Sequence, residues 1–277
     1  MTSLQTELFR RDRRNLILSG EGIVFLTTEE LAELKRVFQS GKIDEIDVFA
    51  YVRTPKSFIE AAFQERIKNS FKIQLSQLEP NALYPNYRQR FLKFIEVFGD
   101  DRVHFRRFDL ERFPNHCVVR DFCQFWQIPF TGPVRKINDG LSRPALAALC
   151  AFRQFGTTIP HGPRAEQING FLLNRIAGLP GPKVRFSPDW VVPVLKTHQD
   201  DIAWMEAQMD ESFDEDLSPT QYDIQDFGDL LRFDPQTVAD LMGLMVEFIT
   251  GQLQARQTRQ IAYQAVVPKL PPVRFSL

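Results

Sequence analysis

Cysteine is scarce in this chain, and its pattern excludes two classes of fold. The three cysteines are Cys117, Cys123 and Cys150, with no Cys-x-x-Cys pair and no histidine at zinc-ligand spacing beside them. Disulfide frameworks and zinc-binding modules need such pairs, so neither is the basis of this fold. We expect Cys117 and Cys123 to lie in one helix as small apolar core residues. Scarce cysteine is typical of the reducing cytoplasm.

Long apolar runs are also missing. A membrane-spanning helix needs about 18 consecutive apolar residues, and the sequence contains no such run. The first residues, MTSLQTELFRRDRR, lack the apolar core of a signal peptide. We therefore expect a cytoplasmic protein without a membrane span.

A strong net charge is the third absence. Lys and Arg number 34 against 35 Asp and Glu, which gives a formal net charge of −1. Non-specific binding of nucleic acid needs a basic field, so no nucleic-acid partner is expected. One local cluster is basic, and we expect it to be the solvated end of a helix over 3–14: Arg10, Arg11, Arg13 and Arg14.

Phenylalanine, in contrast, is abundant. The 277 residues include 25 Phe against 5 Tyr and 3 Trp, within a composition that is 43% hydrophobic and 25% charged. These overall values are typical of a globular protein. Because Phe carries no polar group, the excess predicts aromatic packing in a core.

Strand patterns occur in the first half of the chain. Ile46–Arg53 (IDVFAYVR) is nearly all apolar, which is typical of a strand buried on both faces of a parallel sheet. Arg102–Phe108 (RVHFRRF) is a second strand, and the apolar run Asn15–Ser19 (NLILS) predicts a third. Thr54 and Pro55 then suit the cap and first position of a helix. Apolar residues at helical spacing predict four helices between and after these strands: 28–39 with Thr28 as its cap, 55–73, 86–98 and 115–127.

The second half shows helical patterns only, expected over 142–155, 163–177, 187–209 and 235–255. Alternating strands and helices followed by helices predict an α/β fold with a parallel sheet. We expect one domain over 1–265, with a sheet-forming part at 15–130, a helical part at 140–257, and an irregular tail at 266–277. An acidic run is expected to be a solvated loop: Asp210, Glu211, Asp214, Glu215 and Asp216.

The segment 46–73 is the best candidate for a ligand site. Ligands of open α/β folds bind at the carboxyl ends of the strands, and a helix that follows a strand directs free N–H groups there. Arg53 ends the strand, and Ser57 lies in the first turn of the helix. An Arg fork and a hydroxyl at such a place suit a phosphate. The alternative is that Ser57 is a local cap and Arg53 a surface charge.

Glu21 is a second candidate, because Gly20 and Gly22 flank it after the predicted strand. Glycines on both sides allow a close approach of the backbone. A carboxylate at the edge of the sheet would be placed to act as a general base. The alternative is an exposed turn residue.

These segments, in this order, resemble the sulfotransferase superfamily, and in particular bacterial sulfotransferase-like proteins of polysaccharide modification and their heparan-type relatives. The segment FAYVRTPKSFIEAAFQ is similar to the family's strand–Arg-x-Pro–helix element, and NLILSGEG is similar to the strand before it. YRQRFLKFIEVFGDDRVHFRRFD, VVRDFCQFWQIP and INDGLSRPALAAL are similar to the later helix–strand–helix pattern, so the likeness covers roughly 15–210.

The resemblance implies a P-loop-like parallel sheet flanked by helices. It also implies 3′-phosphoadenosine 5′-phosphosulfate (PAPS) as the sulfuryl donor, without a metal, and a carbohydrate or other hydroxyl as the acceptor. Arg53 would then contact the 3′-phosphate, with Ser57 and Lys56 beside it, and Glu21 would be the catalytic base. Three further residues either line the anionic cleft or lie on the surface: Arg88 and Arg106 as substrate contacts, and His104 as an alternative base.

The sequence departs from the family at two places. Ala61 stands where the family usually has a phosphate-binding Ser. The family's first strand and its phosphosulfate-binding loop find no match, so Met1 is a fragmentary or misassigned start, or the chain is a degenerate relative. Because that strand is central in the family's sheet, we expect strands 46–53 and 102–108 either to pair directly or to leave an exposed apolar gap.

Three functions follow from these observations. The first is transfer of a sulfuryl group from PAPS to a carbohydrate hydroxyl. The second is a non-catalytic relative that acts as a binding or interaction protein, which the missing loop and Ala61 favour. The third is another P-loop nucleotide-dependent transferase, which needs the same missing loop. Whether the chain is an enzyme stays open between them.

Overall fold

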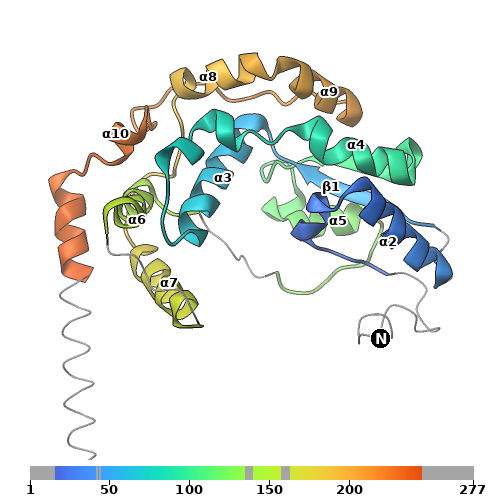
Figure 1. Ribbon diagram of the computed structural model, residues 1–277, viewed down its shortest axis with the longest axis horizontal. Coiled ribbons are helices and arrows are strands. Elements are labelled where there is room, and N and C mark those ends of the chain that lie inside the picture. The colour runs from blue at the N-terminus through green and yellow to red at the C-terminus, as the bar shows by residue number, and fades with distance from the viewer. Residues whose placement is uncertain (1–15, 42, 44, 135–139, 157–162, 245–277) are drawn as a thin grey trace, which may run out of the picture. The chain divides into compact units, whose positions relative to one another are not determined.

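The computed structural model describes residues 16–41, 43, 45–134, 140–156 and 163–244 (Figure 1). The basic cluster of segment 3–14 and the tail at 266–277 lie outside these ranges. The chain divides into two compact units, each described here by itself. Unit 1 comprises Met1–Arg66, Gln74–Gly140 and Arg185–Asp226, and unit 2 comprises Ile67–Ile73, Leu141–Val184 and Phe227–Leu277. The single domain expected over 1–265 stays a prediction.

Unit 1 contains a two-stranded parallel sheet. Strand β1 (Val48–Val52) pairs with β2 (Val103–Arg107), and Val48 lies opposite Val103 at the start of the register. The Phe108 N–H extends the ladder by donating to the Val52 carbonyl at 2.8 Å. The predicted α/β class and both strands are therefore confirmed. Of the two outcomes expected for these strands, direct pairing is the one observed.

Helices cover both faces of this sheet. On one face, Val103 packs in a core with Leu31 of α2 (Thr28–Ser40) and Phe94 of α4 (Tyr87–Phe98). On the other face, the ring of Phe49 lies 4.8 Å from that of Phe125 in α5 (Val118–Phe125). Figure 1 shows β1 among these three helices. Helices lie on both faces as predicted, but the strand is not buried as expected, because only Val52 of β1 is buried and its other residues are half-buried.

The predicted strand at 15–19 is wrong. Residues 16–20 are irregular, with Ile17 60% and Leu18 45% exposed, and a 3₁₀-helix, η1 (Glu21–Phe25), follows. A short apolar run forms a strand only where a neighbouring strand supplies hydrogen bonds. Instead, Ile23 and Val24 within η1 carry the apolar contacts of this segment into the core beside α4.

Helix α2 begins with a capping box. Thr27 accepts from the Glu30 N–H at 3.2 Å, and the Glu30 carboxylate accepts from the Thr27 N–H at 2.8 Å. The predicted cap was Thr28, one residue too late; Glu30 lies three residues after Thr27, whereas Leu31 lies three residues after Thr28. Gly41 ends the helix as expected.

The other elements of unit 1 differ from the predictions in two places. The helix expected over 115–127 begins only at Val118 of α5, and Cys117, expected inside it, has extended geometry. Helix α3 (Pro55–Asn69) begins at Pro55 in unit 1. The single helix expected over 187–209 is instead two, α8 (Pro188–Thr197) and α9 (Gln199–Met209). Between them, His198 leaves helical geometry and its ring stacks 3.8 Å from that of Tyr84. The short 3₁₀-helices are η2 (Leu75–Gln77), η3 (Pro80–Leu83), η4 (Asp100–Arg102) and η5 (Pro114–His116).

The regular elements of unit 2 are helices over its described residues, apart from one isolated antiparallel bridge between Ser142 and Lys183. Unit 2 contains α6 (Arg143–Phe155), α7 (Pro163–Ile176) and α10 (Phe227–Leu230). Residues 235–244 are helical after Asp234, whose carboxylate accepts from the Thr237 N–H at 2.9 Å. These observations confirm the predicted helices, the last as far as 244. No helix in the described ranges is long and apolar enough to cross a membrane.

We predict that Thr27→Ala lowers the free energy of unfolding by about 1 kcal/mol, because α2 loses its capping box. Thr28→Ala is the matched control, since Thr28 lies inside the helix, and it should change stability by less than about 0.5 kcal/mol. Urea unfolding followed by circular dichroism measures both. Equal effects of the two substitutions would contradict the assignment of the cap.

Candidate functional site

The carboxyl ends of β1 and β2 meet at one edge of the sheet, because the strands are parallel. Arg53 follows the last residue of β1, and Arg107 is the last residue of β2. The edge therefore carries two guanidinium groups beside the N-terminus of α3. Residues 210–216, named here the acidic segment, supply carboxylates to it.

Glu215 of the acidic segment caps α3. One carboxylate oxygen accepts from the Thr54 hydroxyl at 2.9 Å, and the other accepts from the Lys56 N–H at 2.9 Å. Burial raises the pKa of Glu215, although both hydrogen bonds oppose the shift. The prediction of a solvated acidic loop is thus wrong for this residue. The N-terminus of α3 binds an anion, as predicted, and that anion belongs to the chain.

Other carboxylates of the acidic segment make ion pairs with arginines, and these pairs hold the segment in place. Asp214 lies 3.4 Å from a guanidinium nitrogen of Arg107, and Asp216 lies 3.1 Å from one of Arg185. Glu211 pairs with Arg112. Each of these cations belongs to unit 1, so the segment lies across the edge of the sheet through several separate contacts.

Arg53 receives none of these carboxylates. Its guanidinium carbon lies 4.2 Å from the centre of the Phe108 ring, and its side chain is half-buried. Burial lowers the pKa of Arg53. Throughout the described ranges, its guanidinium has no hydrogen bond or ion pair. The Arg53 guanidinium is therefore a partly desolvated cation that lies over an aromatic ring and has no anionic partner among the described residues.

The other two predicted phosphate ligands differ from each other. Lys56 is 5% exposed, and its Nζ lies 2.9 Å from Glu60, which also accepts from the Phe186 N–H. Burial raises the pKa of Glu60, and the Lys56 ammonium opposes this shift. The Lys56 charge is thus balanced one helical turn away. The hydroxyl of half-buried Ser57 has no partner in the described part of the chain.

Glu21 lies away from this edge. It is exposed in η1, and no contact joins it to Arg53 among the described residues. The following residues of η1 pack with Val48 and Val103, which are the first residues of the two strands. Arg53 follows the last residue of β1. The structure therefore does not bring the predicted base to the predicted phosphate ligand, and the role of Glu21 stays a prediction.

Arg106 and His104 both face α5. Arg106 makes a two-pronged ion pair with Asp121, with both hydrogen bonds at 2.7 Å, and this raises the pKa of Arg106. The Tyr51 hydroxyl donates to the same carboxylate at 2.7 Å. His104 lies 3.3 Å from Asp47, and its ring makes an edge-to-face contact with that of Trp126 at 5.4 Å. These contacts assign both residues to the packing between the sheet and α5.

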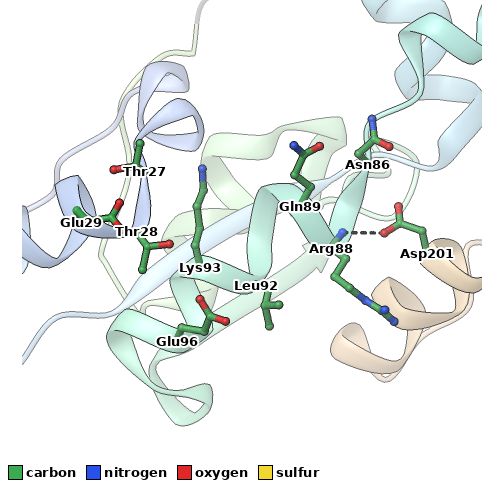
Figure 2. A pocket seen from close by; sticks show the side chains of 10 residues that line it. All are labelled: Thr27, Thr28, Glu29, Asn86, Arg88, Gln89, Leu92, Lys93, Glu96 and Asp201. Carbon is green, nitrogen blue, oxygen red and sulfur yellow. Dashed lines mark hydrogen bonds between the residues drawn. The ribbon is translucent and has the colours of Figure 1, made fainter.

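Arg88 lines a separate open pocket of about 660 Å³ beside α4 (Figure 2). Asp201 of α9 accepts there from the backbone N–H groups of Tyr87 and Arg88 at 2.7 and 2.8 Å. Asp201 thus caps α4 as Glu215 caps α3. The Arg88 guanidinium lies 5.6 Å from the Trp204 ring. No contact connects it to Arg53 within the described ranges.

Neither capping carboxylate is recognisable from the sequence. Glu215 lies 161 residues after Thr54, and Asp201 lies 114 residues after Tyr87. Clustered acidic residues after a helix are most often solvated, and nothing local distinguishes the one that folds back. Only long-range contact information would have found them.

The described residues contain no group of three or more His, Cys, Asp and Glu side chains that would hold a metal ion. Comparison with protein-family models, curated proteins and solved structures finds no match to this chain.

We predict that Asp121→Ala lowers the free energy of unfolding by about 3 kcal/mol, because Arg106 and Tyr51 both lose a buried partner. Tyr51→Phe removes one of the three hydrogen bonds and should cost about 1 kcal/mol. Asp101→Ala, at an exposed position, is the control for removing one negative charge. Urea unfolding measures all three, and a loss for Asp121→Ala no larger than for Asp101→Ala would contradict this assignment.

Proposed function

We propose that this chain is a sulfotransferase-like protein that binds the 3′-phosphoadenosine group of PAPS at the junction of β1 and α3. The observation that carries the proposal is Arg53, a half-buried guanidinium without an anionic partner in the described structure. It follows a parallel strand and precedes a helix whose N-terminus already binds a carboxylate. A phosphate supplies the negatively charged partner that the Arg53 guanidinium lacks there.

Several features support this choice of ligand. A helix N-terminus at the carboxyl edge of a parallel sheet suits phosphate groups, and the free Ser57 hydroxyl adds a donor. The Phe108 ring and the Arg53 guanidinium already form a stacked pair. Two parallel strands with helices on both faces are consistent with the P-loop-like arrangement that the sequence resemblance implies.

The proposed reaction is an in-line displacement. The oxygen of a carbohydrate hydroxyl attacks the sulfur of PAPS, and the bond from that sulfur to the 5′-phosphate oxygen breaks. The leaving oxygen keeps the electron pair, and adenosine 3′,5′-bisphosphate is released. Glu21 takes the proton of the attacking hydroxyl.

A second candidate is a binding protein that recognises the same nucleotide without catalysis. The position of Glu21 favours it, because η1 packs with the first residues of the strands and Arg53 follows the last residue of β1. In this case the Arg53 site keeps its phosphate, and the transfer step does not occur.

Calorimetric titration of the chain with adenosine 3′,5′-bisphosphate tests the shared part of both candidates. We expect binding in the micromolar range, and Arg53→Ala should weaken it by about 30-fold, because charge-assisted hydrogen bonds are worth about 2 kcal/mol. Arg88→Ala is the matched control, since it also removes one guanidinium near an aromatic ring. Equal losses for the two variants, or no binding to the folded wild type, would refute the proposal.

Turnover separates the two candidates. Release of adenosine 3′,5′-bisphosphate from PAPS should depend on a polysaccharide acceptor, and Glu21→Gln should abolish it without changing the affinity for the bisphosphate. Glu29→Gln is the control, because it removes an exposed carboxylate at the start of the next helix. Turnover that survives Glu21→Gln would assign the base elsewhere. Tight binding without turnover in the wild type would favour the binding protein.

A further inference from the structure

The acidic segment occupies the same donors that a phosphate at the α3 N-terminus would use. Both oxygens of the Glu215 carboxylate are engaged there, one by the Thr54 hydroxyl and one by the Lys56 N–H. A phosphate and a carboxylate cannot share these donors, and their charges repel each other. Bound ligand and bound Glu215 therefore exclude each other.

We propose that Glu215 is an internal competitor for the nucleotide site, and that the acidic segment acts as a strap that ligand binding displaces. This inference rests on the proposed function, since it concerns regulation of the site that contains Arg53. The free chain is then a closed form in which its own carboxylate takes the place of the phosphate.

The contacts beside Glu215 suit reversible release. The side chains of Asp214 and Asp216 are 75% and 63% exposed, and ion pairs at such positions contribute little to stability. Asp214 has a left-handed backbone, with φ of 44°, immediately before Glu215. Residues other than glycine adopt this conformation at an energetic cost. Release of Glu215 lets the backbone of Asp214 leave this conformation, which recovers that cost.

Firm anchors lie on both sides of Glu215 and limit the movement to residues 214–222. Before Glu215, Phe213 of the acidic segment is 2% exposed, with its ring 5.3 Å from that of Tyr87 and its N–H bonded to Glu206 at 2.7 Å. After it, the buried Asp223 carboxylate accepts from Arg185 at 3.1 Å. Glu215 is therefore able to leave α3 while the rest of unit 1 keeps its packing.

The test is titration of Glu215→Gln with adenosine 3′,5′-bisphosphate, compared with the wild type. The Gln amide oxygen still accepts from the Lys56 N–H, and its NH2 can donate to the Thr54 hydroxyl oxygen, so the variant keeps a cap on α3 and loses the competing charge together with the bond that Glu215 accepts from Thr54. We expect binding to tighten by about tenfold, which corresponds to about 1.4 kcal/mol. Asp216→Asn removes a charge from the same segment without touching α3 and should change affinity by less than about twofold.

Amide hydrogen exchange supplies a second readout. On addition of the bisphosphate to the wild type, residues 214–217 should exchange faster, while Phe213 and Asp223 keep their protection. Slower exchange over 214–217 in the presence of bound ligand would overturn the displacement.

The outcomes distinguish this inference from the proposed function. Equal affinities for wild type and Glu215→Gln, with binding abolished in both backgrounds by Arg53→Ala, would leave the function standing and overturn the competitor. If Asp216→Asn tightens binding as much as Glu215→Gln does, the competitor is also overturned and the function stands, because any lost negative charge near the site would then have the same effect. Binding to neither protein, or binding that is indifferent to Arg53→Ala, overturns both proposals.

Discussion

The direct parallel pairing of β1 with β2 is the constraint on which the architecture of unit 1 depends. It places the carboxyl ends of both strands at one edge and fixes which side chains point to which face. Val103 and Phe105 face α2 and α4, while the alternate residues His104 and Arg106 face α5. A shift of one residue would exchange the two sets. The register thus commits Arg106 to Asp121 and leaves Arg53 at the edge.

Distant carboxylates then complete the helices around this sheet. The first N–H groups of a helix need partners, and α4 obtains none from its own capping residue, Asn86. Asp201 supplies them to α4, and Glu215 supplies them to α3. Residues 201–215 thus supply the carboxylates that cap the N-termini of both α3 and α4. Under the proposed function, the same arrangement makes the N-terminus of α3 a place where an internal and an external anion compete.

The sequence predicted those parts of the fold that depend on local pattern. Strands 46–53 and 102–108 carry continuous apolar character, and the helices carry regular spacing, so each was recognised within a few residues of its bounds. Patterns failed where the outcome depends on partners far along the chain. The run at 15–19 has the composition of a strand but no strand beside it, and the helix expected over 187–209 breaks where His198 stacks on Tyr84.

The candidate site shows the same division. Arg53 and the α3 N-terminus were predicted from a strand followed by Thr-Pro, which is a local signal. Glu215 was missed because an acidic run gives no indication of which carboxylate becomes buried. Arg106 was predicted either to line the cleft or to lie on the surface, and its ion pair with Asp121, 15 residues away, was missed because nothing local distinguishes Asp121 from an exposed helix residue. Ion pairs of this kind can be predicted only when it is known which helices and strands pack against each other.

The long separation between α3 and its cap has a consequence in time. The Thr54–Glu215 contact joins residues 161 positions apart, so the ribosome makes α3 long before it makes the residue that closes its N-terminus. At about 5–20 residues per second, that interval is on the order of 10–30 s. During synthesis the first N–H groups of α3 therefore lack the Glu215 carboxylate for that interval. Under the proposed function, the order in which the chain emerges gives the nucleotide the first opportunity to bind at this edge.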